Sequence, residues 1–159
     1  MNKSINIAVV GLGQVGSYLL NELNTKKKDI QIKTGKKINI IAISAKNINK
    51  KRQFKINKKI FFKNPLEIFD KKKIDVLFEA IGQSDGVSKK VVEAALKKKV
   101  HVITPNKALI SKHGNELAKI AENNNVNLEF EASVAGGIPI LGSIKEGLAT
   151  NKISKVYGI

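Results

Sequence analysis

A short apolar segment that leads into a glycine-spaced turn, at residues 5–16, constrains the fold of this chain more than any other feature. Residues 5–10 include four β-branched side chains in six positions, which is typical of a buried strand. The glycines Gly11, Gly13 and Gly16 follow directly. Apolar residues then recur at helical spacing, at Val15, Leu19, Leu20 and Leu23. This order of strand, glycine turn and helix is typical of the opening of a dinucleotide-binding unit.

Each glycine of the turn has a physical role in the dinucleotide interpretation. Gly11 permits the tight turn after the strand, Gly13 lets the backbone approach a pyrophosphate, and Gly16 lets the helix pack close to the sheet. The phosphates would bind free N–H groups at the positive end of the helix. We therefore predict a cofactor-binding turn made of Gly11, Leu12, Gly13, Gln14, Val15 and Gly16. The alternative is a structural turn that binds no ligand.

The end of the second expected strand, over residues 38–43, is where such folds distinguish between nicotinamide cofactors. An acidic residue there would bind a ribose 2′-hydroxyl, but this chain has Ser-Ala-Lys-Asn at residues 44–47. Lys46 and, farther along, Arg52 match a 2′-phosphate better, so we predict NADP as the cofactor, with NAD as the alternative. The spacing from Gly16 is longer than usual, and ordinary solvated charge is the competing explanation for both cations.

Strands and helices alternate along the rest of the chain. Further strands are expected over residues 74–80, 100–104, 127–132 and 153–157, with a short edge strand within 53–63. Helices are expected with N-caps at Asn64 and at Ser84 or Asp85, after the turn at residues 105–107, and over residues 140–148. Residues 25–37 have no clear periodicity and are expected to be an irregular surface segment. The alternation predicts one α/β domain over residues 1–159, a Rossmann-like, doubly wound, mostly parallel sheet with helices on both faces.

The loops at residues 11–16, 81–86, 104–107 and 133–139 follow strands and should meet at one edge of the sheet, where open α/β sheets bind ligands. Gly82 is expected to contact the cofactor there. Lys107 is the candidate catalytic residue, because an ammonium beside a nicotinamide and a substrate oxygen can donate a proton or stabilise negative charge. A surface role is the alternative in a chain so rich in lysine.

Other titratable residues have weaker functional patterns. Glu131 ends a strand and faces a glycine loop rich in carbonyl oxygens, which suits an alkali or alkaline-earth cation. Its alternative role is to cap the following helix. Glu79 is ambiguous between the two kinds of role, and His101 and His113 lack partners at metal-ligand or catalytic spacing, so we expect them to be structural.

The net charge of +16 raises nucleic acid as a partner, but the pattern disfavours it. The basic residues are dispersed and are almost all lysine, Arg52 is the only arginine, and aromatic side chains are few. No apolar run is long enough to cross a membrane, and no secretory leader is recognised. The absence of cysteine excludes disulfides and thiol chemistry. We expect a cytoplasmic protein with neither nucleic acid nor membrane as partner.

Several strings together resemble the amino-terminal half of homoserine dehydrogenases. They are the glycine turn at 11–16, Thr-Pro-Asn-Lys-Ala-Leu at 104–109, His-Gly at 113–114, Phe-Glu-Ala-Ser-Val-Ala-Gly-Gly-Ile-Pro at 130–139, and Lys-Glu-Gly-Leu at 145–148. The string at 130–139 is the most specific, and the resemblance spans essentially the whole chain.

The resemblance implies a nicotinamide-dependent oxidoreductase that interconverts L-homoserine and L-aspartate 4-semialdehyde in threonine and methionine biosynthesis. It implies that Lys107 lies beside the nicotinamide, and that a sodium or potassium ion is bound by Glu131 and the backbones of Val134, Gly136 and Ile138. Lys46 stands where the family has an arginine, and Asn47 where it has an acid, which agrees with NADP.

The family's catalytic domain, with its substrate-binding acids and principal acid/base lysine, is not recognised in residues 1–159. We therefore expect this chain alone to bind the cofactor weakly and to turn over little substrate. The full-length protein is expected to be a homo-oligomer that completes the substrate site with that domain. The alternative is a non-catalytic regulatory module that binds a dinucleotide.

Overall fold

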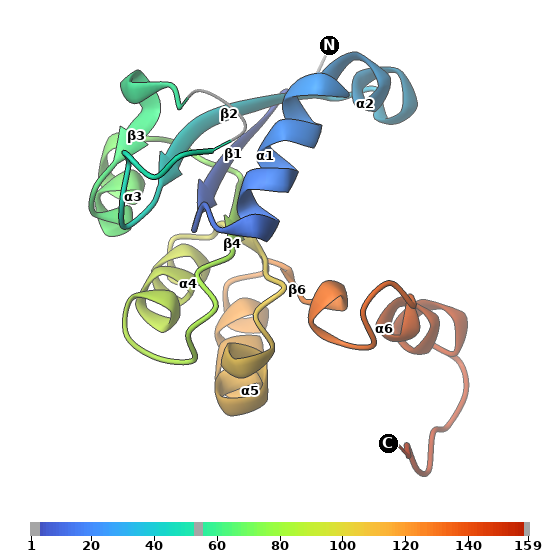
Figure 1. Cartoon of the computed structure of the whole chain (residues 1–159). Coiled ribbons are helices and arrows are strands. Elements are labelled where there is room, and N and C mark those ends of the chain that lie inside the picture. Colours follow the sequence, from blue (N-terminus) through green and yellow to red (C-terminus); the bar gives the residue numbers. More distant parts are fainter. Residues whose placement is uncertain (1–3, 53–55, 158–159) are drawn as a thin grey trace.

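The computed structural model describes residues 4–52 and 56–157, which form a six-stranded sheet with helices packed on it (Figure 1). The strands are β1 (Ser4–Val10), β2 (Lys37–Ser44), β3 (Phe61–Phe62), β4 (Val76–Glu79), β5 (His101–Ile103) and β6 (Leu128–Glu129). Their order in the sheet is β3-β2-β1-β4-β5-β6, and every neighbouring pair is parallel. The predicted Rossmann-like, doubly wound sheet is confirmed.

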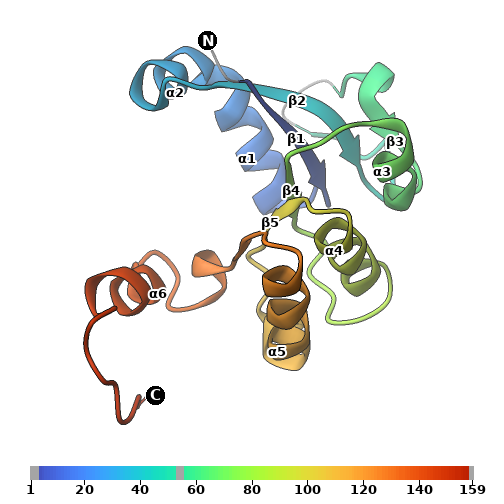
Figure 2. The ribbon, with the colours of Figure 1, turned by 180° about the vertical axis from the view of Figure 1, so that it is seen from behind.

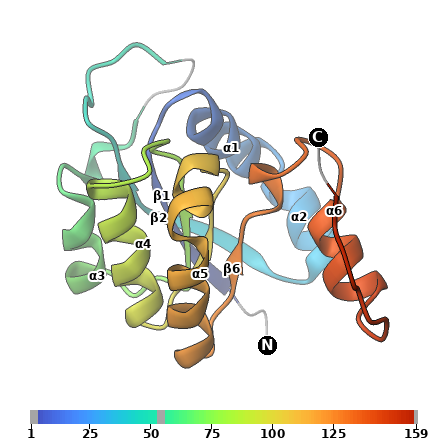
Figure 3. The ribbon, with the colours of Figure 1, turned by 90° about the horizontal axis from the view of Figure 1, so that it is seen from below.

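Helices connect the strands and cover both faces of the sheet (Figures 1 and 3). They are α1 (Gln14–Thr25), α2 (Lys27–Thr34), α3 (Ile68–Lys71), α4 (Val87–Lys97), α5 (Lys107–Asn123) and α6 (Ile140–Gly142), which continues as a π-turn at Ser143–Gly147. Short 3₁₀ turns lie at Lys58–Ile60, Pro65–Glu67 and Glu131–Ser133.

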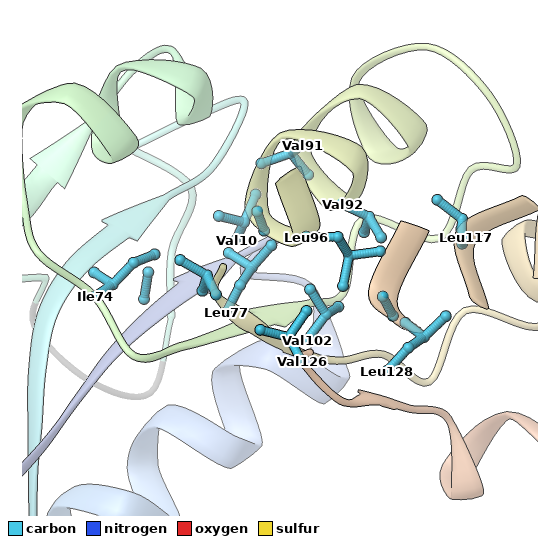
Figure 4. Close-up of a cluster of buried hydrophobic side chains, with 14 of the residues drawn as sticks. Val10, Ile74, Leu77, Val91, Val92, Leu96, Val102, Leu117, Val126 and Leu128 are labelled. Atoms are coloured by element: carbon cyan, nitrogen blue, oxygen red, sulfur yellow. The ribbon is translucent and has the colours of Figure 1, made fainter. Parts of the chain in front are cut away.

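Two apolar clusters form the core, one on each face of the sheet. Because successive side chains of a strand point to opposite faces, Ile7 and Val9 of β1 pack on the face that α1 covers with Leu20. Ala8 and Val10 pack on the other face. The cluster on that second face is the larger one, and α3, α4 and α5 contribute to it. Figure 4 shows its centre, with Val10, Ile74, Leu77, Val91, Val92, Leu96, Val102, Leu117, Val126 and Leu128 labelled.

The order of the strands reverses between β1 and β4, which lie side by side at the middle of the sheet. The chain leaves β1 towards β2 and leaves β4 towards β5, so the loops after these two strands diverge from a common point. Ligands of open α/β sheets bind in the crevice that this divergence creates. The glycine turn at residues 11–16 and the loop at residues 80–86 flank this point.

Three expectations about the helices were wrong. The segment at residues 25–37 contains α2, a surface helix that buries none of its side chains, so no apolar periodicity marks it. It is favoured instead by Asp29 in its first turn, Lys33 in its last turn and Gly35 beyond its end, where φ is +66°. The cap predicted for α4 is also absent, since Gly86 is the N-cap residue and no side chain of the described residues caps the helix. Val15 is 53% exposed rather than part of the buried face of α1.

The carboxyl-terminal segment lies apart from the sheet. Figures 1 and 2 show α6 and the chain after it projecting from the side of the fold. The strand predicted for residues 153–157 is absent, because these exposed residues have no sheet edge beside them with which to pair. The predicted edge strand is present as β3, and Asn64 caps the turn at Pro65 by accepting from the N–H of Leu66 at 3.1 Å. Residues 53–55 lie outside the described part of the chain.

No helix in the described ranges, 4–52 and 56–157, has both the length and the apolar content that a membrane crossing requires.

Candidate functional site

The glycine turn is fixed between the carboxyl ends of β2 and β4. The N–H of Gly11 donates to the carbonyl oxygen of Ser44 at 2.9 Å, and the φ of Gly11 is +90°, a region that favours glycine. A Cβ on Gly11 would lie 2.4 Å from the carbonyl carbon of Ala80. A Cβ on Gly16 would lie 1.9 Å from the carbonyl oxygen of Gly11. Packing alone therefore requires glycine at both positions.

Gly13, in contrast, has open space beside it. Apart from its own chain neighbours, no heavy atom of the described residues lies within 4 Å of the place that its Cβ would take. Its φ is −75°, which any residue can adopt. Gly13 is the N-cap residue of α1, and no described side chain caps this helix, so the first-turn N–H groups keep no side-chain acceptor. An open backbone and an uncapped helix start are the features that suit a bound phosphate.

A cavity of about 470 Å³ adjoins the turn and the exposed side of α1. It is lined by Leu12, Gly13, Gln14, Ser17, Tyr18, Asn21, Lys50, Lys51 and Arg52. The cavity therefore lies between the predicted turn and the cationic loop after β2, which contributes Lys50, Lys51 and Arg52. The volume of the cavity is within the range of small-molecule sites. Ser17, Tyr18 and Asn21 were missed by sequence reasoning. Their spacing from Gln14 places them on the face of α1 opposite the buried Gly16 and Leu20, which is the pattern that could have identified them.

Arg52 supports the loop after β2 through four hydrogen bonds to backbone carbonyls. Its Nε donates to Leu12 at 3.3 Å, and the other nitrogens donate to Asn47, Ile48 and Lys50 at 2.8 to 3.2 Å. The guanidinium therefore attaches the cationic loop to the glycine turn. Lys46, which was predicted together with Arg52, is exposed beside the end of β2.

A fully buried carboxylate, that of Glu79, lies at the end of β4. Its Oε1 accepts from the N–H of Ile81 and from the hydroxyl of Ser88, both at 2.7 Å. Its Oε2 accepts from the hydroxyl of Thr104 at 2.6 Å. The side-chain nitrogen of Asn106 lies 3.4 Å from both oxygens. Glu79 thus connects the loop after β4 with the start of α4 and the end of β5.

Asn106 connects this cluster to the start of α5. Its Oδ1 accepts from the N–H of Leu109 at 3.1 Å and so caps the helix, while its Nδ2 donates to the carbonyl oxygen of Gln83 and to the hydroxyl of Ser88, both at 2.9 Å. Lys107 follows as the first residue of α5, and its side chain is exposed. A cation at the first turn of a 17-residue helix is opposed by the helix dipole, and that turn contains no acidic residue to compensate.

Gly82 lies in the loop that this cluster supports, with a φ of +87° and an exposed backbone. The same loop is attached to α5 by Asp85, whose carboxylate accepts from Nζ of Lys112 at 2.8 Å and lies 2.9 Å from Nε2 of His113. The hydrogen bond from Lys112, then those from Ser84 and His113, lower the pKa of Asp85 far below its usual range. Lys112 and His113 thus both attach this loop to α5 through Asp85.

Glu131 begins the 3₁₀ turn after β6, and its carboxylate faces the start of α6. Its two oxygens accept from the N–H groups of Leu141 and Gly142 at 2.9 and 2.8 Å, which is the capping role that the sequence left as the alternative. The backbones predicted to bind a cation together with Glu131 are those of Val134, Gly136 and Ile138, and all three lie in the loop that follows. Within the described ranges no group of three or more His, Cys, Asp or Glu side chains could hold a metal ion, so backbone oxygens would have to supply most of the ligands.

Most of the predicted site residues lie along one continuous edge of the sheet. The hydrogen bond from Gly11 to Ser44 connects the glycine turn to β2, and the close approach to Ala80 connects it to β4. Glu79 and Asn106 connect the loop after β4 to Lys107. The N–H of Thr104 donates to the carbonyl oxygen of Glu129 at 2.9 Å, which connects this edge to β6. The arrangement places the open glycine turn at one end of this edge and the exposed side chain of Lys107 at the other.

The family model described as "Homoserine dehydrogenase, NAD binding domain" matches residues 11–131 of this chain. The homoserine dehydrogenase of Neisseria gonorrhoeae is 38% identical over 157 residues, which cover 99% of this chain and 36% of that protein. The homoserine dehydrogenase of Bacillus subtilis is 35% identical over the same shares of the two chains. The crystal structure of the Thiobacillus denitrificans homoserine dehydrogenase superposes with a TM-score of 0.83 at 34% identity, covering 95% of this chain and 35% of that one.

The chain thus spans about 36% of the length of these curated relatives. The match begins at the first glycine of the turn and ends at Glu131, so it includes the switch point, the Glu79 cluster and Lys107. These similarities favour an enzyme over the non-catalytic regulatory module.

Proposed function

The chain belongs to the homoserine dehydrogenase family, whose NAD-binding domain it carries, and on this premise we propose that it supplies the cofactor half of an enzyme that interconverts L-homoserine and L-aspartate 4-semialdehyde. The observation that supports the proposal most directly is the pairing of an open glycine turn with an exposed lysine, Lys107, along one edge of the sheet. In this proposal a nicotinamide dinucleotide, when bound, supplies or accepts the hydride.

The glycine turn binds the anionic part of the cofactor in this proposal. Gly13 leaves room for a phosphate, the uncapped N–H groups of α1 donate to it, and the dipole of α1 favours its charge. Gly11 and Gly16 hold the turn against the sheet, so that these donors are fixed before any ligand arrives. Pre-organised donors bind an anion without a further ordering cost.

Lys107 acts at the other end of the crevice. The ammonium and the positive end of α5 both favour negative charge beside the first turn of the helix. An alkoxide that develops on the substrate oxygen would be stabilised there, and the ammonium can exchange a proton with that oxygen. The helix dipole makes a lysine at this position unfavourable for stability, which agrees with a residue that is present for chemistry.

We propose NADP as the preferred cofactor, because the loop after β2 offers cations and no acid. Lys46, Lys50 and Lys51 are exposed there, and Arg52 holds their loop against the glycine turn. The test is a calorimetric titration of the 159-residue chain with NADPH and with NADH. We expect NADPH to bind at least about tenfold more tightly, a difference of about 1.4 kcal/mol. Lys46→Glu should remove this preference, and Lys119→Glu on the exposed side of α5 is the control for net charge. Tighter binding of NADH, unchanged by Lys46→Glu, would contradict the preference.

The reaction is tested by joining residues 1–159 to the part of the Neisseria gonorrhoeae relative that lies beyond its matched region. We expect this chimaera, supplied with NADP⁺, to transfer a hydride from L-homoserine to it, forming NADPH, L-aspartate 4-semialdehyde and a proton. Lys107→Ala should lower kcat/KM by about 10²–10⁴-fold, the usual contribution of a general acid or base. Lys119→Ala, on the same helix, should leave it unchanged. A folded chimaera that oxidises L-homoserine equally well without Lys107 would contradict the role of that lysine.

We also retain a sodium or potassium ion at the loop after β6 as a proposal. Each oxygen of Glu131 accepts one backbone N–H, so the carboxylate keeps lone pairs with which it can bind a cation. The backbone carbonyls of Val134, Gly136 and Ile138 would complete the ligand set. Potassium chloride should then raise the melting temperature of the chain more than choline chloride of the same ionic strength does. Glu131→Gln should abolish this difference, and its persistence would contradict the site.

The finer features of the full-length protein remain part of the same proposal. They are its place in threonine and methionine biosynthesis, its location in the cytoplasm and its assembly as a homo-oligomer.

A further inference from the structure

Glu79 combines two properties that packing alone does not explain. Its carboxylate is completely buried, and none of the ion pairs found among the described residues includes it. Burying a carboxylate away from water costs free energy, and an apolar side chain would fill the same space without that cost. A buried carboxylate with no cation partner among the described residues, at the carboxyl edge of the sheet, is a candidate for a functional role.

We propose that Glu79 is the positioning residue for the nicotinamide half of the site, and that it sets the place of Lys107 and of the loop at residues 81–86. This inference rests on the proposed function, because it assumes that a nicotinamide dinucleotide binds along this edge. In a doubly wound sheet the strands β1 to β3 form one mononucleotide-binding half, and β4 to β6 form the other. Glu79, Thr104 and Asn106 all lie in the second half.

The hydrogen-bond pattern requires an acceptor with two oxygens at this place. Oε1 receives the N–H of Ile81 and the hydroxyl of Ser88, and Oε2 receives the hydroxyl of Thr104. Both hydroxyls accept in their turn from Asn106, Ser88 from the side-chain nitrogen at 2.9 Å and Thr104 from the backbone N–H at 3.0 Å. Their single hydrogens therefore point to Glu79. An ionised carboxylate accepts all of these bonds, whereas a glutamine amide would place an N–H group against one of the donors.

This pattern fixes the orientation of Asn106, and through it the start of α5. The Nδ2 atom is directed to Glu79, Ser88 and the carbonyl oxygen of Gln83, so Oδ1 must face the N–H of Leu109. The side chain of Lys107 leaves the chain at the next residue. The same carboxylate fixes the N–H of Ile81, the residue before Gly82. One buried group thereby sets both parts of the chain that would border a nicotinamide ring.

The test compares two ligands on the 159-residue chain. NADPH reaches both halves of the site, and 2′-phosphoadenosine diphosphoribose lacks the nicotinamide and reaches chiefly the first. We expect Glu79→Gln to weaken the binding of NADPH about tenfold and that of the fragment less than twofold. Thr104→Val removes one donor to Glu79 and the acceptor for the N–H of Asn106. It should therefore also weaken the binding of NADPH much more than that of the fragment. Thr104→Ser keeps the hydroxyl and should bind both ligands as the wild type does.

The outcomes separate this inference from the proposed function. Failure of the wild-type chain to bind NADPH overturns the proposed function, and the inference with it. A wild type that binds both ligands, with variants that lose both equally or neither, overturns the inference alone. If Glu79→Gln does not fold, the comparison of Thr104→Val with Thr104→Ser decides, because both variants keep the carboxylate and differ in the hydroxyl.

Discussion

Two of the glycines in the turn provide a test that separates folding from ligand binding. In Gly16→Ala the new Cβ would lie 1.9 Å from the carbonyl oxygen of Gly11, about 1.5 Å short of an ordinary contact. The obstacle is backbone, so α1 would have to move away from the sheet. Such overpacking costs about 3 kcal/mol or more, which lowers the melting temperature of a chain of this size by roughly 6–12 °C.

Gly13→Ala should leave the stability of the fold nearly unchanged and weaken the binding of NADPH. The new methyl group meets no described atom within 4 Å, and the φ of −75° is available to alanine. Alanine is a poorer N-cap than glycine, but it also reduces the freedom of the unfolded chain, so these opposing effects offset each other to within about 0.5 kcal/mol. The methyl group would project into the space that the phosphates need. We expect a melting temperature within about 2 °C of the wild type and a loss of NADPH affinity of at least about tenfold.

The assay is thermal unfolding followed by circular dichroism, together with calorimetric titration of each folded variant with NADPH. Gly16→Ala is measured for binding below its lowered melting temperature, so that a folding defect is not taken for a binding defect. A Gly13→Ala variant that binds NADPH like the wild type would refute the phosphate role of this glycine. A Gly16→Ala variant that melts like the wild type would refute the steric argument.

Three further predictions concern the core, a surface ion pair and the cationic loop. Leu77→Ala removes a fully buried side chain of β4 from the larger core cluster, and should lower the free energy of unfolding by about 2–5 kcal/mol in urea titrations, whereas Leu77→Met should cost less than about 1.5 kcal/mol. Because the pKa of Asp85 is lowered in the folded state, its contribution to stability is complete above its ordinary value of 3.8 and is lost as the pH falls below it. The melting temperature of Asp85→Asn should therefore lie below that of the wild type at pH 6, and the gap should close in acid; a gap independent of pH contradicts the ion pair with Lys112. Arg52→Lys keeps the charge but not the planar set of donors, so it should weaken NADPH binding as much as Arg52→Ala does; rescue by lysine would show that charge alone matters.

Sequence reasoning succeeded where a local pattern reflects a local cause. The β-branched run before Gly11 and the largely apolar runs at β2, β4 and β5 identified the strands, because the strands of a parallel sheet that helices cover on both faces are rich in apolar residues. Asn64 and the turn at Asn106 were placed correctly, since an asparagine before a helix start can accept from the N–H groups of its first turn. It failed at α2, whose stability depends on its end residues rather than on a buried face.

The candidate site was predicted only in part, because some of its features depend on contacts between distant segments rather than on a local pattern. The glycine spacing indicated the turn, but the sequence could not show that Gly11 and Gly16 face backbone while Gly13 faces open space. Arg52 was proposed for its charge, and the structure uses its nitrogens to hold the loop. Glu79 was ambiguous because its partners lie up to 27 residues away along the chain.

The sequence by itself determined the class of fold and the edge of the sheet at which a ligand is expected. Both depend on the alternation of strands and helices and on the spacing of glycines, which are patterns over a few residues at a time. The tertiary structure alone decided which glycine remains open, which cation supports a loop, and which carboxylate is buried where the two strand ends and two helix starts meet. These properties depend on hydrogen bonds and contacts between segments that meet only when the parallel sheet has formed. At Glu79 the ends of β4 and β5 and the starts of α4 and α5 converge on two oxygen atoms.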